Sequence, residues 1–162
     1  MVVKPKYAKA KGSKKEIECK EILAQFGYVC TKAGGSLGLF DVVGERFNPN
    51  GVEGIALQSK KKGGGTKQEK EAFVAFDRLA SSTLKVWAEY LEGGFWWWTL
   101  YYRRPDGGWF PVSVVEFKKW GKKIVLRSQR GLNPGPAWSD LTAEHPSVHI
   151  LELRRVHSPN KV

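Results

Sequence analysis

Cysteine and histidine are scarce in this chain, which argues against a metal site built from these residues. Only Cys19 and Cys30 occur among 162 residues, and they do not have the spacing of metal ligands. Both lie in apolar segments, so we expect reduced core cysteines, with a disulfide between them as the alternative. The three histidines, His145, His149 and His157, fall near the C-terminus and are expected at the surface.

Long apolar runs are also absent, which argues against a membrane-spanning helix. The sequence also lacks a basic amphipathic helix with an aromatic face, the pattern that indicates binding to a membrane surface. The N-terminal segment is rich in lysine and lacks the apolar core of a signal peptide. We therefore expect an intracellular protein, cytoplasmic or nucleoid-associated, encoded by a cell or by a virus.

Positive charge, in contrast, is abundant. Lysine and arginine number 27 against 16 acidic residues, which gives a net charge of +11 and a pI of about 9.7. A globular protein this basic usually binds a polyanion, and nucleic acid is the first candidate. Apolar residues make up 41% and aromatic residues 12%, enough for one packed core. We predict a flexible basic arm over residues 1–12 and a single domain over residues 13–162.

Two capping boxes predict the starts of two helices. Ser13–Glu16 opens the first, which runs to about Phe26 with an apolar stripe at helical spacing. Thr66–Glu69 opens the second, whose apolar stripe continues to Ala80.

Apolar runs between turn signals predict strands. Three follow the first helix in hairpin-like succession, and the others follow the second helix. Together they predict an α/β domain with a mixed sheet flanked by helices and further antiparallel strands toward the C-terminus. The predicted strands cover residues 28–33, 39–43, 52–60, 84–90, 95–102, 109–117, 122–127 and 148–153.

Polar residues that could bind a metal or take part in catalysis lie in two of these strands. Asp41 sits in a buried apolar run, and Gln58-Ser59-Lys60 closes the next one. Gln58 and Lys60 project from the same face because side chains alternate along a strand. If the runs pair, an acid, an amide oxygen and an ammonium converge at one sheet edge. Such a group can hold a divalent cation beside a phosphate and position a water for attack. The alternative is an ordinary strand that ends in a solvated lysine.

A second acid, Glu16, is placed to join this group. It lies three residues before Cys19 and seven before Leu23, so it shares the buried side of the first helix. From there a carboxylate could reach a cation across the sheet. The alternative is that Glu16 only completes the capping box.

The order of these motifs resembles a known family. Lys11–Glu16, Leu23 and Gly27-Tyr28 are followed by Lys32–Ser36, Asp41–Gly44 and Gln58–Lys60 at similar spacing. This order is similar to that of the archaeal-type Holliday junction resolvases, which belong to the PD-(D/E)XK nuclease superfamily. The resemblance covers roughly residues 11 to 90. It implies a PD-(D/E)XK nuclease-like fold and a homodimeric, Mg²⁺-dependent endonuclease that resolves four-way DNA junctions by paired symmetric nicks.

The resemblance also implies roles for single residues, with Mn²⁺ able to replace Mg²⁺. The metal ligands would be Glu16, Asp41 and Gln58, the catalytic lysine Lys60, and the active-site loop serine Ser36. The lysines that bracket this site would contact DNA phosphates: Lys11, Lys14, Lys32, Lys61 and Lys62.

Two positions depart from the family pattern. Gln58 stands where the family has an acid, and Ile17 stands where a basic residue often follows the helix glutamate. Glutamine at the first of these positions also occurs in Mrr-like restriction endonucleases, so it is compatible with catalysis but should lower cation affinity. A Mrr-like duplex endonuclease and a catalytically inactive DNA-binding relative are therefore the alternative functions.

A tryptophan-rich strand, Phe95–Tyr102, is the remaining unusual feature. Alternation places Trp96 and Trp98 on one face and Trp97 on the other. One face can enter the core, and the other needs a cover. A dimer interface, the C-terminal segment and stacking on unpaired bases are the three possibilities.

Overall fold

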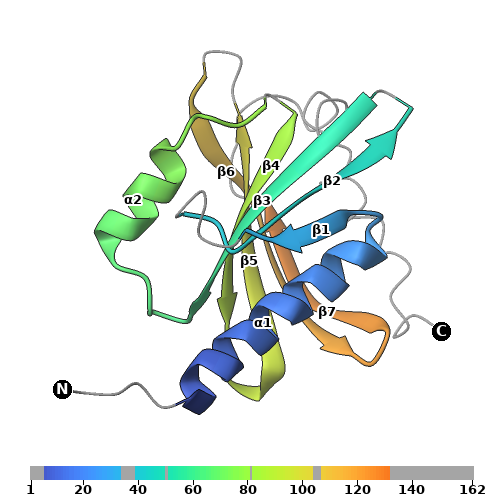
Figure 1. The fold of residues 1–162 in the computed structure, drawn as a ribbon, viewed down its shortest axis with the longest axis vertical. Coiled ribbons are helices and arrows are strands. Elements are labelled where there is room, and N and C mark those ends of the chain that lie inside the picture. Colours follow the sequence, from blue (N-terminus) through green and yellow to red (C-terminus); the bar gives the residue numbers. More distant parts are fainter. Residues whose placement is uncertain (1–5, 34–38, 50, 81, 104–106, 132–162) are drawn as a thin grey trace.

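The computed structural model describes residues 6–33, 39–49, 51–80, 82–103 and 107–131. It is a mixed α/β structure made mostly of strands, in which a curled mixed sheet forms a half-barrel with two α-helices (Figure 1). The helices are α1 (Lys6–Gln25) and α2 (Lys67–Ala75). None of the described helices is long and apolar enough to cross a membrane.

The sheet contains seven strands within the described residues, and they lie side by side in chain order. All neighbours are antiparallel except β3 and β4, which run parallel because α2 connects them as a crossover. A short 3₁₀ turn, Glu92–Gly94, joins β4 to β5. The strands are β1 (Val29–Lys32), β2 (Val42–Asn48), β3 (Gly51–Lys61), β4 (Thr83–Tyr90), β5 (Phe95–Arg103), β6 (Trp109–Trp120) and β7 (Lys123–Gly131).

The first helix begins earlier than predicted. It starts at Lys6, so Ser13 lies inside the helix and the capping box predicted there is wrong. Residues 6–12, predicted as part of a flexible arm, belong to this helix. Alanine and lysine are strong helix formers, and residues 6–12 are rich in both. Gly12 costs the helix only about 1 kcal/mol relative to alanine, which the neighbouring turns can absorb.

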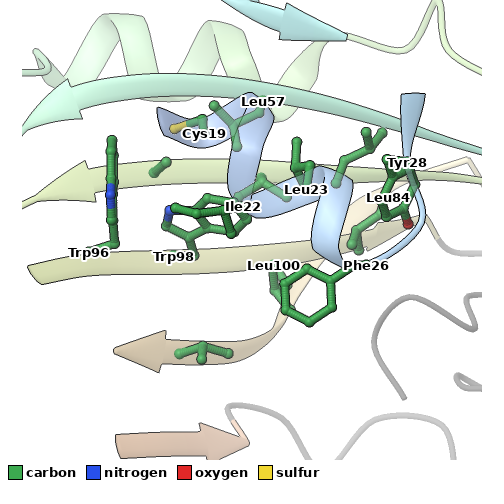
Figure 2. Packing of buried hydrophobic residues seen from close by; sticks show 14 of the residues in the cluster. Cys19, Ile22, Leu23, Phe26, Tyr28, Leu57, Leu84, Trp96, Trp98 and Leu100 are labelled. Atoms are coloured by element: carbon green, nitrogen blue, oxygen red, sulfur yellow. The ribbon is translucent and has the colours of Figure 1, made fainter. Parts of the chain in front are cut away.

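The predicted stripe of α1 packs on one face of the sheet. Cys19, Ile22 and Leu23 are fully buried or nearly so, and they belong to the larger of two apolar clusters (Figure 2). From the sheet this cluster takes alternate residues of several strands, including Leu57, Val86, Trp96, Trp98 and Leu100. Trp96 and Trp98 are therefore core residues of the chain itself.

The second helix packs on the opposite face. Phe73 of α2 contacts Trp87 with ring centroids 5.1 Å apart, and Ala56 belongs to the same cluster. Because Leu57 faces α1 and Ala56 faces α2, alternation along β3 places Gln58 and Lys60 on the α2 side. The site residues of β3 thus share a face with α2, and Glu16 approaches on the other helix.

The capping box that opens α2 is confirmed, but the helix is shorter than its apolar stripe. Thr66 Oγ1 accepts a hydrogen bond from the Glu69 amide at 3.0 Å, and Glu69 reaches back to the Thr66 amide. The helix ends at Ala75, and Phe76 is already extended. The predicted strand over residues 148–153 and the three histidines lie outside the described residues.

A buried ion pair fixes the end of α1 to the β2–β3 hairpin. The Arg46 guanidinium bonds the Glu53 carboxylate at 2.8 Å and donates to the Phe26 carbonyl at 2.9 Å. Tyr28 donates its hydroxyl to the other Glu53 oxygen at 2.8 Å. Arg46 and Glu53 are 4% and 1% exposed, so each charge depends on the other for compensation.

Removing one member of this pair should therefore cost far more than removing both. We expect Glu53→Ala to lower the free energy of unfolding by about 3–5 kcal/mol, because it leaves the Arg46 charge buried without a partner. Urea denaturation measures the loss, with exposed Glu45→Ala as the matched control. An Arg46→Met/Glu53→Leu double variant should recover most of it. A Glu53→Ala protein as stable as the control would contradict this account.

Candidate active site

Asp41 lies directly before β2, against the end of β3. Its amide donates to the Leu57 carbonyl at 2.8 Å, and its carbonyl accepts from the Ala33 amide at 2.9 Å. The Asp41 side chain then accepts a hydrogen bond from the Ser59 amide at 2.8 Å. This bond places the carboxylate beside the Gln58-Ser59-Lys60 segment, as the pairing of the two predicted runs requires.

Several charges act on this one carboxylate. Burial raises the pKa of Asp41 above its ordinary value, and the nearby Glu16 carboxylate raises it further. The hydrogen bond from Ser59 and the ammonium groups of Lys60 and Lys32 oppose the rise in pKa. The direction of the net shift means that an ionised Asp41 is short of stabilising partners in the folded protein.

Glu16 reaches the site from α1. Its carboxylate forms an ion pair of 3.2 Å with Lys32, at the end of β1, and the Glu16 side chain is 24% exposed. The capping alternative for Glu16 is excluded because the helix starts ten residues earlier, at Lys6. Ile17, the second departure from the family pattern, is exposed.

Gln58 supplies an amide oxygen that the protein leaves unused. The residue is 8% exposed, and its Oε1 atom has no hydrogen-bond partner among the described residues. A buried polar atom without a partner costs about 1–3 kcal/mol. An oxygen held at this cost, on the residue before the Ser59 whose amide bonds Asp41, is a candidate ligand for a cation.

Lys60 is held by a residue that sequence reasoning assigned only to the capping box. Its ammonium bonds the Glu69 carboxylate on α2 at 2.5 Å. Bonds from Lys60 and from the Thr66 amide lower the pKa of Glu69 and keep it ionised. The loop between β3 and α2 lies close to Trp87 of β4, because a Cβ at Gly65 would come within 2.6 Å of the Trp87 ring. The sequence signal for the Lys60–Glu69 contact was a glutamate in the first turn of the helix that follows the Lys60 strand.

A buried lysine fixes the other end of α2. Lys85 is fully buried on β4 and donates to the carbonyls of Phe73, Val74 and Phe76 at 2.6, 3.1 and 2.8 Å. Burial and the charge of Arg103 lower the pKa of Lys85 to about 8, against the influence of Asp77. These bonds end the helix at Ala75. In the sequence Lys85 was only one polar position in an apolar run.

The remaining predicted residues are placed as follows. Lys14, Lys61 and Lys62 are exposed, and Lys32 is exposed while paired with Glu16. Lys11 belongs to α1, and Ser36 lies outside the described residues.

The two cysteines take no part in the site. Both are free, which confirms the prediction of reduced thiols. Cys19 is buried as predicted, whereas Cys30 is only partly buried. Burial raises the pKa of both thiols, that of Cys30 to about 11, so neither is a ready nucleophile.

A metal at this position would have a mixed oxygen shell. No group of three histidine, cysteine or acidic residues suited to a metal occurs among the described residues. The available donors are the carboxylates of Asp41 and Glu16, the amide oxygen of Gln58 and the Ser59 carbonyl. Hard oxygen donors of this kind suit Mg²⁺, which keeps several waters and needs few protein ligands. The unused Gln58 oxygen and the raised pKa of Asp41 both fit such a cation.

Comparisons with known proteins return no relative. Protein-family models, curated proteins and solved structures were each compared with the chain, and none matches. The family resemblance of the motifs therefore stays a prediction.

The raised pKa of Asp41 gives a prediction about stability. A carboxyl whose folded pKa is raised favours the protonated form, so its contribution to stability falls as pH rises through that pKa. Asp41→Asn keeps an acceptor for Ser59 and removes the charge. In EDTA at neutral pH we expect this variant to melt at a higher temperature than the parent, with the difference vanishing at low pH.

Mg²⁺ should raise the melting temperature of the parent and not that of Asp41→Asn. Exposed Glu45→Gln is the matched control and should behave like the parent in both respects. Differential scanning fluorimetry across pH measures the effect. An Asp41→Asn protein that melts lower than the parent in EDTA would show that the charged carboxylate is not destabilising.

Proposed function

We propose that this chain is a Mg²⁺-dependent endonuclease that cuts branched DNA, and that its substrate is a four-way junction. The observation that supports it best is the Asp41 carboxylate, bonded to the Ser59 amide with Glu16 and Lys60 both acting on its pKa. Two carboxylates and a lysine that influence one another, next to a chain segment with an unused amide oxygen, form a suitable arrangement for hydrolysing a phosphodiester. The net charge of +11 supports a polyanionic substrate.

Each residue would have a distinct task. Asp41, Glu16 and Gln58 would hold Mg²⁺, which when bound neutralises the scissile phosphate and lowers the pKa of a water. Lys60 would donate hydrogen bonds to the attacking water and to the phosphate oxygens as negative charge develops. Among the proposed catalytic residues Glu69 contacts Lys60, and it is a positioning residue because it fixes where the ammonium can lie. Hydrolysis would leave a 5′-phosphate and a 3′-hydroxyl.

Paired symmetric nicks need two active sites, so the proposal includes a homodimer. Exposed apolar residues at the β2–β3 hairpin give one surface that a second copy could cover. Phe47 is 78% exposed and pairs with Val52, which is 46% exposed, and Val29 on the edge strand β1 is also exposed. Trp96 and Trp98 lie in the core, so only the Trp97 face of the tryptophan-rich strand is left for a cover.

A cleavage assay separates the proposal from its alternatives. We expect the protein with Mg²⁺ to place paired nicks in a labelled four-way junction and to leave a matching duplex intact. Duplex cleavage would instead support the Mrr-like function, and binding without cleavage would support an inactive relative. Lys60→Ala should lower the cleavage rate by about 10²–10³-fold with junction binding retained, since it removes one charge-stabilising donor. Lys123→Ala, at an exposed position on β7, is the control. Full activity in Lys60→Ala would refute the assignment.

Gln58 gives a second test of the same site. Gln58→Glu restores a carboxylate at the ligand position, so half-maximal cleavage should need less Mg²⁺ than in the parent. The measurement is a Mg²⁺ titration of junction cleavage. Gln68→Glu adds the same charge at an exposed position on α2 and should leave the Mg²⁺ requirement near that of the parent. Complete loss of cleavage in Gln58→Glu would be incompatible with a simple ligand role.

A further inference from the structure

A cavity of about 460 Å³ lies on the sheet beyond the candidate active site. It is formed by the loop after β3, the residue that follows β4 and the strands β5 to β7. No residue of the predicted site except Lys62 contributes to it. The lining includes Lys62, Leu91, Trp97, Glu116, Arg127 and Arg130.

The cavity opens on the same sheet face as Lys60. Lys60 pairs with Glu89, Glu89 with Trp97, and Trp97 with Glu116, and residues paired across neighbouring strands share a face. Trp97 is thus two strands away from Lys60. At about 4.8 Å per strand, their backbones lie about 10 Å apart. A strand of nucleic acid bound at Lys60 could extend into the cavity.

The charge of the cavity is positive. Its single acid, Glu116, is bonded by Arg127 at 2.6 Å and by the Ser128 hydroxyl at 3.4 Å, so its charge is already compensated. Arg127 also lies over the Phe95 ring at 4.3 Å, which fixes its position. Lys62 and Arg130 have no acidic partner in the part of the chain that the structure describes. Two cations therefore remain to meet an anion.

We propose that this cavity holds an unpaired nucleotide of the DNA strand next to the cleavage site. The proposal rests on the proposed function, because it takes DNA as the substrate. The aromatic face of Trp97 would stack on the base, and Arg130 and Lys62 would contact its phosphates. The volume is in the range of small-ligand sites. A base can enter only where it has left the duplex, so the cavity would favour branched over continuous DNA.

Binding without cleavage tests the proposal. The full-length protein in EDTA is titrated into a fluorescein-labelled short oligothymidine and into a labelled blunt duplex, with fluorescence anisotropy as readout. We expect Arg130→Ala to weaken oligothymidine binding about tenfold and to lower the salt slope by about 0.7, the value for one phosphate on a single strand. Trp97→Leu should weaken oligothymidine binding by a similar factor or more. Neither variant should change duplex binding more than twofold.

The control is Arg78→Ala, which removes the same charge from an exposed residue before the start of β4, at the opposite end of that strand from Leu91. Circular dichroism checks that each variant is folded. Because Arg130 is exposed, we expect Arg130→Ala to fold normally. Unchanged oligothymidine binding in Arg130→Ala overturns the proposal, as does failure of the parent to bind the oligothymidine. If thymidine monophosphate competes as well as the oligothymidine, the cavity is a free-nucleotide site and the proposal is wrong.

These outcomes are independent of cleavage. A parent that binds the oligothymidine through Arg130 but cuts no junction supports the cavity and refutes the nuclease. A parent that cuts junctions while Arg130→Ala binds normally supports the nuclease and refutes the cavity.

Discussion

The hydrogen bond from the Ser59 amide to the Asp41 carboxylate is the constraint on which the candidate site depends. It joins the start of β2 to the end of β3 and holds an acid where burial and Glu16 both disfavour its charge. A protein gains little stability from such an arrangement, because the opposing lysines compensate the charge only in part. Desolvated acids with a specific charge environment are frequent at functional sites. A bound cation would supply the missing compensation.

Each helix supplies a carboxylate to the site, Glu16 acting on Asp41 from α1 and Glu69 bonding Lys60 from α2. Glu16 depends on α1, whose end is fixed by the buried Arg46–Glu53 pair. Glu69 depends on α2, whose end is fixed by Lys85. Neither anchor touches the site, yet each determines where a site carboxylate lies. The strands after β4 extend the same face past Lys60 and form the positively charged cavity, so one surface connects the proposed chemistry with the proposed strand contact.

Sequence patterns predicted the parts of this structure that depend on periodicity. The stripe of α1, the three strands in succession and the approach of Asp41 to Gln58 and Lys60 follow from helical and strand repeats. The start of α1 differs from the prediction because helix propensity over residues 6–12 outweighs the local capping motif at Ser13. Lys85 and Glu69 were missed for a different reason. Their partners lie nine to twelve residues away along the chain, so only the crossover between β3 and β4 brings them together.

The position of a bound cation tests the central claim most directly. Mn²⁺ can be soaked into crystals of the protein, and an anomalous difference map then locates the ion without reference to activity. The account predicts one peak in contact with a carboxylate oxygen of Asp41 and the amide oxygen of Gln58, and none in the Asp41→Asn protein. A map with no peak beside Asp41, or with Mn²⁺ bound only elsewhere on the chain, would contradict it.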